Sequence, residues 1–291
     1  MRLSPFAKLL SLAAAAFSLA ACQPEPAPEP GTETPIIIGH EIVLDSALYG
    51  GARSISVSLP WSYQRGRHSY PVLYVVDGGA QQDFIPMAGM GALASLSGQY
   101  REFIVVGVQT ENRYFELTAP STTAADLRWI SENGGADQFR QHLLEEVKPY
   151  IEARYRTSGE DALIGESLAG LFITETFLRA PGSFDHFIAV SPSLWWRGEG
   201  LSHEAPDLLA AGDFAGRSLY LTIGNEGADL QGGMGVEMQT GMDRLVAALD
   251  AGAPDDLTWW YQPMHDEQHH TIYNPATLQA LRLVFAPDEG D

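Results

Sequence analysis

The chain has 291 residues, and 45% of them are apolar, which is enough for a sizeable packed core. Its 37 acidic and 17 basic residues give a formal net charge of -20 at pH 7, which argues against nucleic acid or an anionic lipid surface as a partner. Because there is only one cysteine, neither a disulfide bond nor a thiolate metal site can form within one chain.

Residues 1–21 have the features of a secretory signal peptide. Basic residues lie at Arg2 and Lys8, and the apolar stretch that follows is too short to span a bilayer comfortably. The run Leu19-Ala20-Ala21-Cys22 resembles the lipobox of bacterial lipoproteins, in which the cysteine becomes the lipidated first residue. We therefore expect export, membrane contact only through a lipid on Cys22, and a position at the periplasmic face of the outer membrane or at the cell surface. Ordinary signal cleavage beside an incidental cysteine is the alternative.

Residues 22–35 are rich in proline and glutamate and cannot bury a core, so we predict an extended tether. Folded structure should begin near Ile36. No internal repeat or second linker is visible in the sequence, which predicts one catalytic domain over residues 36–291.

Short runs rich in β-branched and aromatic residues predict eight strands. These runs are Ile36–Leu44, Arg53–Leu59, Val72–Val76, Phe103–Gln109, Ala162–Gly165, Phe187–Ser191, Leu219–Gly224 and Leu257–Gln262. The first two runs look like antiparallel strands at the start of the sheet. Most later runs are continuously apolar, as expected for a largely parallel sheet covered on both faces. Helical patterns lie between them, at 139–151, 168–179, 238–249 and 275–285. This alternation predicts an α/β fold whose ligands lie beyond the carboxyl ends of the strands.

The third run ends in the turn Asp77-Gly78-Gly79-Ala80. Paired glycines permit a close approach between the backbone and a substrate, so an amide of this turn, with Gly79 as the candidate, could stabilise a developing oxyanion. The simpler interpretation is that these glycines only terminate the strand.

The fifth run leads into Gly165-Glu166-Ser167-Leu168-Ala169-Gly170, which fits the nucleophile elbow of an α/β hydrolase. A serine on such a tight turn needs small neighbours two positions before and after it, and Gly165 and Ala169 meet this requirement. The amide of Leu168 would be the first oxyanion donor. Taken alone, the string also fits an ordinary connection between a strand and a helix.

Two tryptophans, Trp195 and Trp196, follow the sixth run, at the predicted active-site edge. They could line a pocket for an aromatic substrate or simply pack in the interior.

A serine nucleophile needs a base and an acid, which in this fold follow it in the order acid and then histidine. The acid should leave the seventh strand, where Glu226 stands and Asp229 competes. For the base we favour His269, just before the last predicted helix, with His270 and His265 as alternatives. A metal site built from these histidines and Glu267 is a further alternative.

Six segments carry a family resemblance: YPVLYVVDGG, VVGVQTENR, FRQHLLEEVKPYIEARYRT, LIGESLAGL, FIAVSPSLWW and EQHHTIYNPATLQALRLVF. In these segments the chain resembles the esterase family that includes enterochelin esterase-like and other siderophore esterases, feruloyl esterases and mycolyl acyltransferases. The resemblance implies an α/β-hydrolase fold, with Ser167 as nucleophile, His269 as base, Gly78 and Gly79 in the oxyanion loop and Arg113 near the substrate. Departures from the family pattern are Ala169 in the elbow, His270 after the base and Ala119 inserted before Pro120.

These features lead to the hypothesis that the protein hydrolyses a small carboxylic ester through an acyl-enzyme, with no metal or organic cofactor. An acyltransferase of the same fold and a non-catalytic lipoprotein that binds a ligand in a hydrolase pocket are the alternatives.

Overall fold

The computed structural model describes residue 31, residues 33–227 and residues 233–287. The predicted signal peptide, Cys22, most of the predicted tether and the alternative acid Asp229 lie outside these described residues. The chain divides into a unit that ends at Ile37 and a unit that begins at Ile38. The second unit contains all the helices and strands named below.

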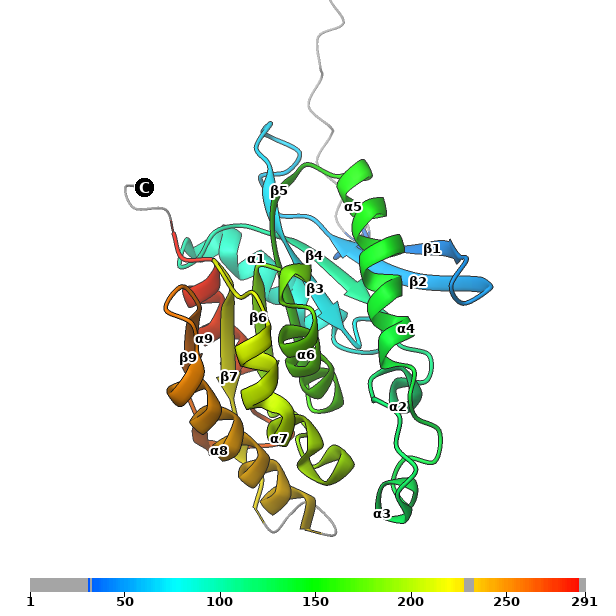
Figure 1. Cartoon of the computed structure of the whole chain (residues 1–291). Coiled ribbons are helices and arrows are strands. Elements are labelled where there is room, and N and C mark those ends of the chain that lie inside the picture. The colour runs from blue at the N-terminus through cyan, green and yellow to red at the C-terminus, as the bar shows by residue number, and fades with distance from the viewer. Residues whose placement is uncertain (1–30, 32, 228–232, 288–291) are drawn as a thin grey trace, which may run out of the picture. The chain divides into compact units, whose positions relative to one another are not determined.

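Eight strands form one sheet in the order β1-β2-β4-β3-β5-β6-β7-β9 (Figure 1). The strand β2 pairs antiparallel with β1 and with β4, whereas all later neighbours pair parallel. The bounds are β1 His40–Ser46, β2 Gly51–Ser58, β3 Tyr70–Val76, β4 Ile104–Val108, β5 Thr157–Glu166, β6 His186–Val190, β7 Ser218–Thr222 and β9 Thr258–Tyr261. Each strand lies on one of the eight predicted runs, so the predicted α/β-hydrolase fold with a mostly parallel sheet is confirmed.

The continuous apolar runs arise because both faces of the sheet are covered. Successive side chains of a strand point to opposite faces. In β3, Val72 and Tyr74 accordingly belong to one core cluster, and Leu73 and Val75 belong to the other. Every residue of β3 and of β4 is buried. A strand covered on only one face would instead alternate apolar and polar residues.

Helices form a layer on each face of the sheet (Figure 1). The helices α1 (Phe84–Ser97) and α9 (Tyr273–Val284) supply one core cluster, and α4 to α8 supply the other. Helices and helical turns between α1 and α9 are α2 Arg113–Glu116, α3 Ala124–Leu127, α4 Ala136–Gln141, η1 His142–Val147, α5 Lys148–Arg154, α6 Leu168–Arg179, η2 Pro181–Ser183, α7 Trp196–Ala211 and α8 Met234–Gly252. Among the described residues, none of the helices is both long and apolar enough to cross a membrane.

A second, two-stranded sheet was not predicted from the sequence. It pairs β8 (Gly224–Asn225) in parallel with β10 (Met264–Gln268), and Asn225 lies opposite Gln268. A strand of two residues has no readable pattern. This small sheet nevertheless brings together the residues that follow each strand, Glu226 and His269.

Candidate active site

Ser167 lies on the sharp turn between β5 and α6, at the carboxyl edge of the sheet. Its φ of 62° and ψ of -118° lie in a region that L residues rarely adopt. Two backbone hydrogen bonds hold the turn: the amide of Ser167 donates to the carbonyl of Val190, and the amide of Ser193 donates to the carbonyl of Ser167, each at 3.0 Å. Such a turn exposes the serine hydroxyl beyond the strand ends, as a nucleophile elbow requires.

Small residues around Ser167 allow β5 and α6 to come this close. A Cβ added at Gly165 would lie 2.5 Å from the Cβ of Ala169. A Cβ at Gly170 would lie 2.7 Å from the carbonyl oxygen of Val190. Both distances are shorter than any ordinary carbon contact, so glycine is required at both positions. Ala169, where the family pattern has glycine, is accommodated because position 165 has no side chain.

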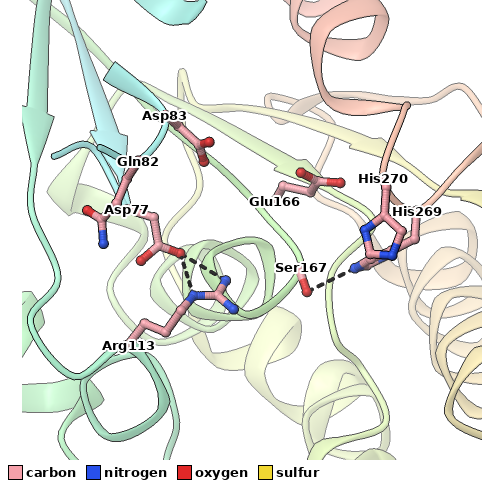
Figure 2. Close-up of a pocket in the computed structure, with 8 residues that line it drawn as sticks. All are labelled: Asp77, Gln82, Asp83, Arg113, Glu166, Ser167, His269 and His270. Carbon is pink, nitrogen blue, oxygen red and sulfur yellow. Dashed lines mark hydrogen bonds and ion pairs between the residues drawn. The ribbon is translucent and has the colours of Figure 1, made fainter. Parts of the chain in front are cut away.

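His269 and Glu226 complete a chain of three polar side chains that begins at Ser167. Nε2 of His269 lies 3.1 Å from Oγ of Ser167 (Figure 2). On the other side of the ring, Nδ1 lies 2.7 Å from Oε2 of Glu226, which is only 3% exposed. These two atoms form an ion pair by distance but are not aligned as a hydrogen bond, and they have no other hydrogen-bond partner among the described residues.

The surroundings of His269 favour its protonated form. Burial by itself would lower the pKa of this imidazole, but the contact with Glu226 and the charges of Glu226 and Glu166 outweigh it and raise the pKa above the usual value. An imidazolium formed by taking a proton from Ser167 would therefore be stabilised where it forms.

Two cavities meet at Ser167. One, of about 360 Å³, is lined by polar groups, and the other, of about 220 Å³, is lined mainly by apolar and aromatic side chains. The first is lined by Asp77, Gln82, Asp83, Arg113, Glu166, Ser167, His269 and His270. The second is lined by Arg113, Tyr114, Trp129, Ile130, Ser167, Leu168, Ser193, Trp195, Met234, Met238 and His269. An ester held at Ser167 could therefore extend one part into each cavity.

Two carboxyl groups in the polar cavity have raised pKa values. Burial raises the pKa of Glu166 to about 7, and the nearby charges of Asp83 and Glu226 act in the same direction. Burial and the charge of Asp77 raise the pKa of Asp83 to about 6. The sequence alone indicated neither group, because a raised pKa depends on burial and on neighbours from other elements.

The two predicted oxyanion donors differ in the structure. Leu168 is the first residue of α6, so its amide has no acceptor within the helix, and the residue lines the apolar cavity beside Ser167. The amide of Gly79 instead donates to Oε1 of Gln82 at 2.9 Å, and Gly79 lines neither cavity. Gly78 allows β3 and β4 to approach closely, since a Cβ there would lie 2.4 Å from the Cα of Gly107.

Arg113 begins α2 and reaches both cavities. Its Nε and Nη2 each lie 2.9 Å from Oδ2 of Asp77 (Figure 2). Asp77 is 6% exposed, and its other carboxylate oxygen accepts a hydrogen bond from the hydroxyl of Thr110. The resemblance indicated an arginine near the substrate, but the aspartate that holds it is 36 positions away in the sequence.

The two tryptophans lie in different surroundings. Trp195 lines the apolar cavity and is 9% exposed. Trp196 lines neither cavity, and its indole nitrogen donates to the carbonyl of Ala119 at 2.9 Å. Trp196 therefore packs in the interior, where it supports Trp195 through an edge-on ring contact.

The structure also distinguishes the alternative histidines. His270 lines the polar cavity, and His265 lies on β10 beside a separate cavity next to Glu226. Of the three, His269 has its Nε2 in contact with Ser167. No group of three or more His, Cys, Asp or Glu residues in the described part of the chain is arranged to hold a metal ion.

Solved structures of other proteins have a fold similar to that of this chain. An IroE-like serine hydrolase from Shewanella oneidensis has a TM-score of 0.77 and 25% identity over 85% of this chain and 80% of that one. The siderophore hydrolase EstB from Aspergillus nidulans has a similar fold, with a TM-score of 0.72 and 22% identity over 89% of this chain and 99% of that one.

Among curated sequences, the siderophore triacetylfusarinine C esterase of Aspergillus fumigatus is 31% identical over 52% of this chain and 54% of that protein. The chain spans about half, or less, of the length of the curated relatives it matches most clearly. The model of the family described as "Putative esterase" matches residues 46–244, which is more than half of the chain. The chain therefore belongs to this esterase family.

Proposed function

We propose that the protein is a serine carboxylic-ester hydrolase in which Ser167 is the nucleophile, His269 the base and Glu226 the acid. The observation that carries this proposal is the continuous contact from Oγ of Ser167 to Nε2 of His269 at 3.1 Å, and from Nδ1 to Glu226 at 2.7 Å. Membership of the esterase family supports it.

The reaction follows from this geometry. Oγ of Ser167 attacks the carbonyl carbon of the ester, and its proton passes to Nε2 of His269 while Glu226 stabilises the imidazolium. The oxyanion that forms receives a hydrogen bond from the amide of Leu168. His269 then gives the proton to the departing alcohol, which leaves an acyl group on Ser167. A water molecule deprotonated by His269 attacks this acyl group, and Ser167 recovers its proton as the acid departs.

Small esters related to siderophores are the substrates that we propose to test first. Two relatives named as siderophore esterases support this choice. The two cavities that meet at Ser167, of about 360 and 220 Å³, suit a small ester with one polar and one apolar part.

Replacing the nucleophile tests the proposal. Ser167→Ala should lower the turnover of an activated short-chain ester by about a millionfold, because the three side chains act as a unit. The wild-type protein should also react with a fluorophosphonate at Ser167, and the variant should not. Near-normal hydrolysis by the variant would contradict the proposal. Analysis of the products with an added alcohol would separate hydrolysis from acyl transfer.

We also propose that Cys22 carries a lipid that anchors the protein to a bacterial membrane, as the sequence before it predicts. Radiolabelled fatty acid should be incorporated into the wild-type chain and not into Cys22→Ser. Equal labelling of both chains, or none of either, would contradict this.

A further inference from the structure

The position of the ester carbonyl is marked by the residues that the two cavities share. Of the residues that line these cavities, Arg113, Ser167 and His269 line both. An ester attacked by Ser167 places its carbonyl between its two substituents, and therefore at this junction. Of these three residues, Arg113 is neither the proposed nucleophile nor the proposed base.

The loop that should supply a second oxyanion donor has its candidate amide occupied. The amide of Gly79 donates to Oε1 of Gln82, and the side-chain nitrogen of Gln82 donates in turn to the carbonyl and hydroxyl oxygens of Thr110 at 3.1 and 3.0 Å. Gln82 is therefore held in place at both ends of its amide. Freeing the Gly79 amide would require breaking its hydrogen bond to Gln82, whose side chain Thr110 holds in place.

The guanidinium of Arg113 has N–H donors that the contact with Asp77 does not use. Nε and Nη2 both contact one oxygen of Asp77, while Nη1 has no hydrogen-bond partner among the described residues. Figure 2 shows the guanidinium lying between Asp77 and Ser167. The Arg113 side chain is 36% exposed, so it borders open cavity instead of being enclosed by protein. A guanidinium carries five N–H donors and a permanent positive charge.

We propose that Arg113 is a catalytic residue that donates a charged hydrogen bond to the ester oxygen as the tetrahedral intermediate forms. This inference rests on the proposed hydrolase function. When Oγ of Ser167 bonds to the carbonyl carbon, the π electron pair moves onto the oxygen, and that oxygen gains a full negative charge. Hydrogen bonds from a fixed cation to this oxygen strengthen as the charge develops, so they lower the barrier more than they favour substrate binding. Arg113 and the amide of Leu168 then form the oxyanion site together.

Asp77 and Thr110 are positioning residues in this arrangement. The two oxygens of Asp77 are divided between Arg113 and the hydroxyl of Thr110. This holds the guanidinium against one side of the cavity and limits its rotation. Asp77 has a φ of 58°, a conformation that asparagine also tolerates, so Asp77→Asn removes the charge without adding backbone strain.

The test compares Arg113→Gln and Arg113→Lys with wild-type full-length chain on an activated acetate ester and on its thionoester. A C=S group accepts hydrogen bonds poorly, so an enzyme that uses strong oxyanion donors prefers the oxoester. Arg113→Gln should lower kcat/KM for the oxoester by roughly a hundredfold or more, mainly through kcat, and should lower the oxoester preference. Arg113→Lys, which keeps the charge but loses the planar fork, should fall between. Asp77→Asn and Thr110→Val should shift the preference in the same direction by less, and Thr110→Ser should retain it.

The matched control is Arg217→Gln, which breaks another arginine–aspartate ion pair, with Asp185 at 2.5 Å, at the opposite end of the strands. It should leave both rates unchanged, and thermal unfolding should show that all variants fold. An Arg113→Gln variant that raises KM at unchanged kcat, or keeps the oxoester preference, would overturn the inference while leaving the hydrolase function in place. Wild-type chain that neither hydrolyses the oxoester nor reacts with a fluorophosphonate would overturn the proposed function, and the inference with it.

Discussion

Replacing Glu226 by glutamine isolates the contribution of the acid that we propose. The carboxylate is 3% exposed, and its Oε2 lies 2.7 Å from Nδ1 of His269. Glutamine has nearly the same size but no charge, and its NH₂ group can donate to Nδ1. That contact would favour the histidine tautomer whose proton lies on Nε2, which cannot accept the proton of Ser167. The change therefore removes both the stabilised imidazolium and the correct tautomer.

The expected loss is about ten-thousandfold in kcat for Glu226→Gln, which corresponds to about 5 kcal/mol of barrier. The assay is steady-state hydrolysis of an activated ester as a function of pH. His269 must be neutral to act as base, so activity falls as the pH drops through its folded-state pKa. Because Glu226 raises that pKa, Glu226→Gln should also move the acid limb of the residual activity to lower pH.

The matched control is Asp229→Asn, which removes a carboxylate three positions further along the chain. It should leave the rate and the pH profile unchanged. A Glu226→Gln variant within tenfold of the wild-type rate, or a large loss in Asp229→Asn alone, would refute the assignment of the acid.

Two further predictions concern the scaffold that supports the site. Gly165→Ala should lower the free energy of unfolding by about 1–3 kcal/mol, because its Cβ would lie 2.5 Å from that of Ala169, and the double variant with Ala169→Gly should recover part of the loss. Unchanged stability of the single variant in urea denaturation would contradict this packing. Glu116→Gln should lower the free energy of unfolding by about 1–3 kcal/mol, because the 3% exposed Arg53 loses its buried countercharge at 2.8 Å and keeps only the exposed carboxylate of Glu111 at 3.3 Å. The same denaturation experiment measures it, and a loss below 1 kcal/mol would count against a structural role for this ion pair.

Much of the fold could be predicted because the sheet is covered on both faces. Strands such as β3 and β4 are fully buried, so they are continuously apolar and easily recognised in the sequence. The short sheet of β8 and β10 could not be predicted, because β8 has only two residues and its partner lies about 40 positions away. This sheet brings Glu226 beside His269, so the sequence indicated the two residues but not the reason they meet.

The features of the site also differ in how far they could be predicted from the sequence. The elbow around Ser167 is a local constraint, since a sharp turn needs small neighbours, and such constraints leave a pattern in the sequence. The amide of Gly79 donates its hydrogen bond to the side chain of Gln82, so the rotamer of Gln82 decides whether that amide is free. The guanidinium of Arg113 is oriented by Asp77, which lies on another element. Contacts between side chains of separate elements leave no such pattern. For that reason the predicted Gly79 donor and the role of Trp196 could not be assessed from spacing alone.

The central claim is that Ser167 carries the acyl group between the two halves of the reaction. The most direct measurement is mass spectrometry of the full-length chain quenched within milliseconds of mixing with an activated ester, followed by peptide mapping. We predict a transient mass increase equal to the acyl group, located on Ser167 and absent from Ser167→Ala. An ester that is hydrolysed with no adduct on Ser167, or with the adduct on another residue, would contradict the account.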